Sequence, residues 1–199
     1  MSELSRECAV LDREATNNTD TGSQAGSGEG GVPKRKGRKY VTGIFEASVL
    51  SSLAIVGGTA KAGFGIVSTG KIWEDALRDA VGEFLGINTN ATETNSVGSG
   101  RFVSCRTTGL NASELHELPA AEVRVKMKDA TRLLLSDGRE KGTEVKAICL
   151  GCAGMVGLEE AVREACVEEL GIEGGTGVAI LDGVRAGFGV MIGLVSGGF

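Results

Sequence analysis

The stretch Glu144–Leu158 holds the side chain with the clearest chemical potential. An apolar run, Val145–Leu150, leads into a glycine-rich turn that contains Cys152. The run has the length of a buried strand, and the helical spacing of apolar residues after the turn predicts an amphipathic helix. Cys152 therefore lies where we expect a strand to end and a helix to begin. Backbone N–H groups of Ala153 and Gly154 at such a helix start favour a thiolate and can hold an anion.

Cys152 also has a purely structural interpretation, as a buried cysteine that fills a tight turn, and the local pattern favours neither interpretation over the other. Cys149 lies inside the apolar run, where we expect it to be buried. The two form one C-x-x-C pair, but no second pair follows, and His116 is far away in the sequence. A zinc site or other metal site is therefore not expected.

Hydroxyl side chains follow two other predicted strands. Ser68 and Thr69 come after one apolar run, and Thr107 and Thr108 come at the end of another. Ligands of parallel sheets bind beyond the carboxyl ends of the strands, so we expect these groups to face the same cleft as Cys152. The alternative for Ser68 and Thr69 is an ordinary turn that caps the next helix.

The segment GIVSTGK, residues 65–71, contains both glycines and the lysine of the phosphate-binding loop GxxxxGK[ST]. However, Ile72 stands where that loop needs a hydroxyl for magnesium. The positions after Gly65 also have the apolar pattern of a strand. We therefore do not expect nucleotide binding.

Composition limits the classes of protein and partner. The 199 residues have room for one or two domains, and 32 glycines are about twice the usual share. The net charge of -5 argues against nucleic acid or an anionic membrane as the main partner. Five scattered cysteines, with no signal peptide and no apolar run of membrane-spanning length, indicate reduced thiols in a cytoplasmic protein.

Strands and helices are predicted to alternate from Tyr40 onward. We expect strands over residues 40–44, 63–68, 101–107, 145–150 and 177–183, and helices over 46–56, 71–86, 120–138, 155–170 and 184–198. This order is typical of an α/β protein with a parallel sheet flanked by helices. Asp182 is expected to cap the last helix.

The chain is predicted to have four parts. A short helix over residues 2–15 precedes a flexible linker over 16–39, whose basic run we interpret as solvated linker. An α/β lobe follows over 40–181, and a C-terminal helix over 182–199.

Several motifs resemble those of the Asp/Glu/hydantoin racemase superfamily, in its hydantoin or allantoin racemase branch. They are GIFEASV, GIVSTGKIWE, RFVSCRTTGLNASELHEL, CLGCAGM and LDGVRAG, and together they cover most of Tyr40–Gly189. The resemblance implies a two-lobed fold and cofactor-independent inversion of a carbon next to a carbonyl. Two cysteines would face the substrate from opposite sides, and Cys152 would be the second of them. The amides of Ala153 and Gly154, with Ser68 and Thr69, would hold the carboxylate or ring carbonyl and its enolate.

The chain departs from that pattern at its beginning, where it has neither the first strand motif nor the first cysteine. The resemblance therefore implies one lobe plus a remnant of the other, residues 2–15, with the last helix meant to pack on the first lobe. Racemase activity on a small-molecule substrate would then require the missing lobe, and homo-oligomers are conceivable. Two alternatives remain open: a single-cysteine decarboxylase of the arylmalonate type, and a non-catalytic remnant.

Overall fold

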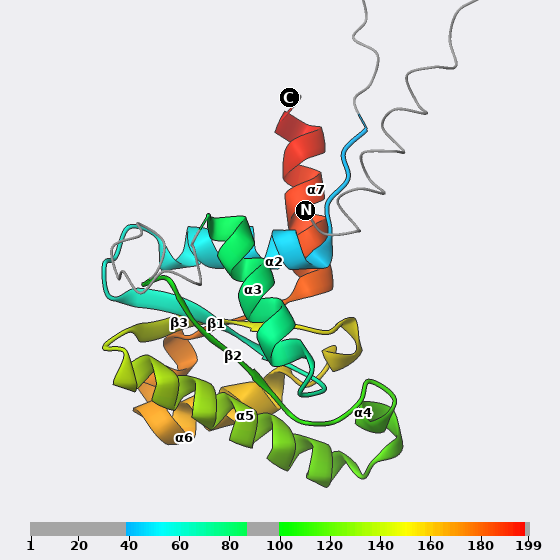
Figure 1. Cartoon of the computed structure of the whole chain (residues 1–199), viewed down its shortest axis with the longest axis vertical. Helices are drawn as coiled ribbons and strands as arrows, with labels where there is room; N and C mark the ends of the chain where they lie inside the picture. The colour runs from blue at the N-terminus through cyan, green and yellow to red at the C-terminus, as the bar shows by residue number, and fades with distance from the viewer. Residues whose placement is uncertain (1–38, 87–99, 198–199) are drawn as a thin grey trace, which may run out of the picture. The chain divides into compact units, whose positions relative to one another are not determined.

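A four-stranded parallel sheet lies at the centre of the protein (Figure 1). The structure is a computed structural model, and it describes residues 39–86 and 100–197. The strands are β1 (Ala62–Ser68), β2 (Phe102–Thr107), β3 (Glu144–Leu150) and β4 (Ala179–Asp182), in the spatial order β2-β1-β3-β4. All neighbouring strands are parallel, which confirms the predicted fold class. The predicted helix over 2–15 and most of the linker over 16–39 lie outside the described residues.

Helices cover both faces of the sheet. In Figure 1, α2 (Ile44–Val56) and α3 (Trp73–Leu85) lie above it, and α5 (Ala120–Glu140) and α6 (Glu159–Gly177) lie below it. The short α4 (Glu114–Glu117) precedes α5, and α7 (Gly183–Gly197) follows β4. In the described part of the chain, no helix is long and apolar enough to cross a lipid bilayer.

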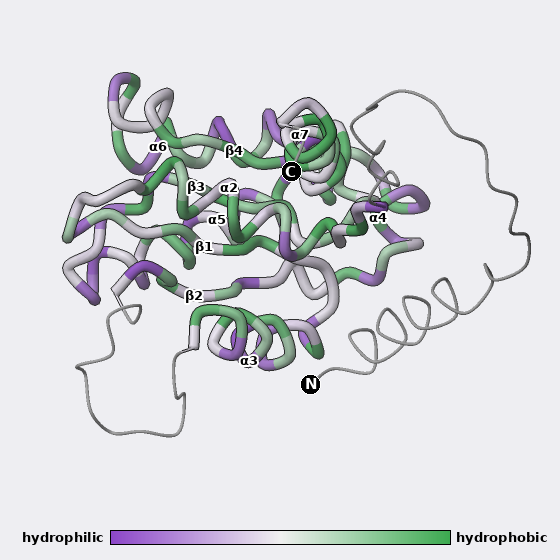
Figure 2. Tube along the Cα trace, turned by 90° about the horizontal axis from the view of Figure 1, so that it is seen from above, coloured by the Kyte–Doolittle hydropathy of each residue, from purple (hydrophilic) through white to green (hydrophobic). Residues whose placement is uncertain are grey.

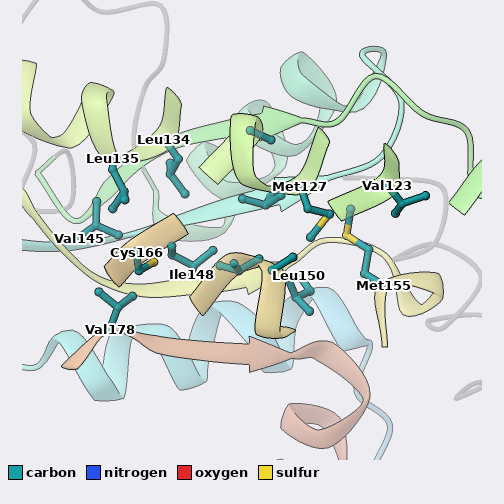
Figure 3. Close-up of a cluster of buried hydrophobic side chains, with 14 of the residues drawn as sticks. Val123, Met127, Leu134, Leu135, Val145, Ile148, Leu150, Met155, Cys166 and Val178 are labelled. Carbon is teal, nitrogen blue, oxygen red and sulfur yellow. The ribbon is translucent and has the colours of Figure 1, made fainter. Parts of the chain in front are cut away.

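The core consists of two hydrophobic clusters separated by the sheet. One lies between the sheet and α5 and α6, and it includes Met127, Leu134, Ile148 and Met155 (Figure 3). The other lies between the sheet and α2 and α3, and it includes Phe64. Strand β1 has a neighbour on each side and helices on each face, so all seven of its residues are buried.

The predicted strand over residues 40–44 is wrong. The described chain forms no strand there, and α2 begins at Ile44 with the extended residue Gly43 as its N-cap. Val41 is 79% exposed, and the two edges of the sheet are formed by β2 and β4. An apolar, β-branched segment has strand propensity, but without a neighbouring strand it has no hydrogen-bonding ladder to join.

Edge strand β2 is fixed to helices on both faces of the sheet. On one face, Arg106 and Ser104 donate hydrogen bonds to the carboxylate of Asp137 in α5. On the other, the backbone N–H and the hydroxyl of Thr107 donate to Glu74 in α3. Burial alone would raise the pKa of Asp137, but the hydrogen bonds from Arg106 and Ser104 outweigh it and hold that pKa below its usual value. These contacts set the position of the carboxyl end of β2.

Helix α7 packs on α2, and its buried residues, Gly183 and Ala186, lie in its first turn. Asp182 accepts a hydrogen bond of 2.7 Å from the N–H of Arg185, which confirms its predicted capping role. Gly183 lies against Ser48 of α2. Farther along, Phe188, Ile192 and Val195 are 68%, 61% and 65% exposed. Figure 2 shows α7 largely in the hydrophobic colour, so an apolar face extends beyond the contact with α2.

We expect the backbone amides of residues 187–197 to exchange hydrogen at least about 100-fold faster than those of β3, because a glycine-rich helix depends on packing for its stability. Hydrogen exchange followed by mass spectrometry on the 199-residue chain measures this difference. Protection of α7 equal to that of β3 would show that the whole helix has its packing partner within this chain.

Candidate functional site

Cys152 follows β3 at the carboxyl edge of the sheet. It is the N-cap of a single 3₁₀ turn, η1 (Ala153–Met155), and its backbone is extended. The N–H of Gly154 points at the sulfur of Cys152, with 3.4 Å between nitrogen and sulfur. The backbone amide of Gly154 is therefore placed to donate to this sulfur.

The expected helix start at Cys152 is wrong, because α6 begins only at Glu159. Met155 is completely buried in the cluster below the sheet, where its side chain points toward that of Met127 (Figure 3). Gly157 then turns the chain with a φ of 89°. Met155 is thus buried by a 3₁₀ turn, whereas Val162 and Cys166 are buried within α6. Since α6 begins at Glu159, Cys152 does not lie at its N-terminus, where the helix dipole acts.

The ends of β1 and β3 approach each other closely beside Cys152. The N–H of Gly151 donates a 2.8 Å hydrogen bond to the carbonyl of Val67. A Cβ atom on Gly151 would lie 2.9 Å from Cβ and Oγ of Ser68 and from Cγ2 of Ile66. The structure thus brings Ser68 next to the turn of Cys152, but Ser68 and Thr69 are only 1% and 3% exposed.

The loop after β2 is fixed onto the loop after β1. The N–H groups of Thr108 and Gly109 donate to the carbonyls of Ser68 and Thr69 at 2.9 and 3.0 Å. The hydroxyl of Thr108 donates to the carbonyl of Thr69 and accepts from the N–H of Leu110. The polar groups at the ends of β1 and β2 therefore bind mainly each other.

The same loop carries His116, on α4, to the turn of Cys152. Leu115 is buried in the cluster below the sheet and anchors α4 there. A Cβ atom built on Gly154 would lie 3.6 Å from Sγ of Cys152, 3.7 Å from Nε2 of His116 and 3.8 Å from Cδ1 of Leu115. The sequence did not single out His116 as a site residue. One usable signal was that the segment with Leu115 connects the end of the strand expected over 101–107 to the helix expected over 120–138. Such a segment must lie near the carboxyl edge of the sheet.

The other described cysteines are buried. Burial raises the pKa of the Cys105 thiol to about 12, and it raises the pKa values of Cys149 and Cys166 to about 11. Cys149 lies 2.9 Å from the hydroxyl of Ser52. Cys105 belongs to the cluster above the sheet, whereas Cys152 packs against the cluster below it. The sheet therefore separates the two, and Cys105 does not face the same site.

No metal centre is evident in the described ranges, where no group of three or more His, Cys, Asp or Glu side chains is arranged to hold an ion. A small, mostly apolar cavity of about 40 Å³ lies on the α2 side of the strand ends, lined in part by Ile44, Ser48, Cys149 and Gly151. That volume holds one or two water molecules, so it cannot hold an amino-acid-sized ligand.

The family model for Asp/Glu/hydantoin racemases matches residues 36–190. The chain belongs to this family. It is also 31% identical over 158 residues to an uncharacterized protein, C1F7.10, of Schizosaccharomyces pombe. The alignment covers 79% of this chain and 54% of the yeast protein, so the chain spans about half the length of that relative. No solved structure matches the chain significantly.

We expect Gly151→Ala to lower the free energy of unfolding by about 1–3 kcal/mol, because its methyl group would overlap Ser68 and Ile66 where β1 and β3 meet. Gly187→Ala in α7 is the matched control, since nothing lies within 4 Å of the added methyl group. It should leave stability unchanged or raise it by up to about 1 kcal/mol. Urea unfolding measures both, and equal stabilities would contradict the close approach at Gly151.

Cys152 is expected to be alkylated at least about tenfold faster than Cys105, Cys149 or Cys166, since each unit by which a pKa is raised lowers the thiolate fraction tenfold. Limiting iodoacetamide at neutral pH, followed by peptide mapping, gives the order of labelling. Labelling of any of the three buried thiols ahead of Cys152 would contradict the assignment of Cys152 as the reactive residue.

Proposed function

We propose that this protein is a cofactor-independent racemase or epimerase in which Cys152 exchanges a proton with a carbon next to a carbonyl group. One observation carries the proposal beyond family membership. Cys152 is the one thiol among the described cysteines that is not buried, and a backbone amide points at its sulfur at the carboxyl edge of the sheet.

The proposed step begins with the thiolate of Cys152. Its sulfur takes the proton from the substrate carbon, and the electron pair of the broken C–H bond moves to the carbonyl oxygen to form an enolate. The N–H groups of Ala153 and Gly154 lie at the start of the 3₁₀ turn and are proposed to stabilise the negative oxygen, with the N–H of Gly154 turning to it from the sulfur of Cys152. The hydroxyls of Ser68 and Thr69 are buried, so we propose that they contact substrate only when this edge of the sheet opens.

Inversion also requires an acid on the opposite face of the enolate. Among the described residues, the other three thiols are buried, and Cys105 lies across the sheet from Cys152. We therefore propose that the second proton donor comes from residues outside the described ranges or from another protein chain, including a second copy of this one.

For the substrate we propose amino acids or their cyclic derivatives, in the hydantoin and allantoin class, because the motifs around Cys152 resemble those of that branch. A small molecule rather than nucleic acid or a membrane is the proposed partner, in keeping with the net charge of -5, and the proposed location is the cytoplasm. A second candidate function is decarboxylation of an arylmalonate-type substrate. It is favoured by Cys152 being the single accessible thiol among the described cysteines, because protonating an enolate from one face needs only one acid.

The purified chain is expected to exchange the C5 proton of an optically pure 5-substituted hydantoin for deuterium faster than it destroys optical rotation, because only one face has a described acid–base group. Cys152→Ser should lower the exchange rate by about 100-fold or more. Proton NMR in D₂O and polarimetry measure the two rates in parallel.

Cys105→Ser serves as the control and should retain exchange. Exchange that persists in Cys152→Ser would exclude Cys152 as the base. Racemisation as fast as exchange that is abolished both in Cys152→Ser and in Cys105→Ser would identify Cys105 as the second acid. Release of CO₂ from an arylmalonate without exchange on hydantoins would favour the decarboxylase.

A further inference from the structure

The imidazole of His116 and the thiol of Cys152 flank the same point in space. That point is the position of a Cβ atom on Gly154, which lies 3.7 Å from Nε2 of His116 and 3.6 Å from Sγ of Cys152. Glycine places no side-chain atom at this point, so the thiol and the imidazole both border the same space beside Gly154.

The position of His116 is set by its neighbours in the fold. Leu115 is buried, and the carboxylate of Glu114 accepts a hydrogen bond from the N–H of Asn111 at the start of the turn. Thr108 fixes the beginning of the same loop to β1. The imidazole itself is exposed, so it can exchange protons with bulk water.

We propose that His116 is a positioning and proton-relay residue for Cys152. This inference rests on the proposed role of Cys152 as a base. After the thiolate has taken the substrate proton, the thiol passes it to Nε2 of the neutral imidazole, directly or through one water molecule. The sulfur becomes a thiolate again, and the imidazolium releases the proton to solvent. The imidazolium form also stabilises the thiolate electrostatically, as in other cysteine–histidine pairs.

The other charged side chains on α4 are those of Glu114 and Glu117, and Glu122 lies at the start of α5, which packs against α4. Within the described ranges, none of them forms an ion pair with His116. The segment from Gly151 to Leu158 has no ionisable side chain other than Cys152.

The test measures the alkylation rate of Cys152 between pH 5 and 9 by peptide mapping of the full 199-residue chain. In the unmodified protein we expect a second inflection in addition to that of the thiol, because a change in the charge of the neighbouring imidazole changes the reactivity of the thiolate. His116→Gln should remove this inflection. The matched control is Glu117→Gln, the next residue on α4, which is exposed and should leave the profile unchanged.

Gly154→Ala tests the same pair without changing either partner. The added methyl group would make only ordinary contacts of 3.6–3.8 Å, so the unfolding midpoint should not change, but it would occupy the space between the two side chains. We expect the inflection to be lost here as well. A profile that is unchanged in both His116→Gln and Gly154→Ala would overturn the proposal.

Substrate exchange adds a second readout. Deuterium exchange at C5 of the hydantoin should fall about 10- to 100-fold in His116→Gln and should be restored by added imidazole, whereas added imidazole should not rescue Cys152→Ser. Exchange that is unaffected in His116→Gln would overturn the relay. If the unmodified protein shows no substrate exchange but His116→Gln still loses the inflection, the pairing stands and the proposed function fails.

Discussion

The arrangement of this protein depends on how closely its elements pack around β1. A Cβ atom on Gly65 of that strand would lie 2.3 Å from a methyl carbon of Leu134, so α5 contacts the strand where a side chain would otherwise be. At the carboxyl end of β1, a Cβ atom on Gly151 would likewise lie only 2.9 Å from Cβ of Ser68. Because interiors are packed to high density, these contacts fix β1, β3 and α5 relative to one another. This packing also fixes the position of the turn that contains Cys152.

Much of the fold could be predicted from the sequence because its signals are local. The strands at 63–68, 101–107 and 145–150 are apolar runs of strand length, and the structure places β1, β2 and β3 within one residue of those bounds. The strand expected at 40–44 failed for a non-local reason. Its composition suits a strand, but pairing requires a neighbour, and no periodicity within the segment reveals one.

The candidate site was less predictable than the fold. Cys152 could be identified because it follows a strand and lies between glycines. The start of α6 could not, since a 3₁₀ turn buries Met155 at a spacing that also suits an α-helix. The approach of His116 to Cys152 depends on the order of the strands and on the burial of Leu115. Neither property is visible in the short segment around His116 itself.

The order of the strands also determines at which stage of folding the thiols come to differ in reactivity. Pairing of β1 with β3 joins Ala62 to Glu144, so it closes a long loop and is slow compared with local helix formation. Until that pair forms, Cys149 has no sheet to shield it, and Cys152 has no ordered turn. All the cysteines of the newly made chain are then chemically similar. The contrast between a reactive Cys152 and an inert Cys149, three residues apart, is therefore a property of the completed fold, and the ratio of their labelling reports how much of a sample has folded.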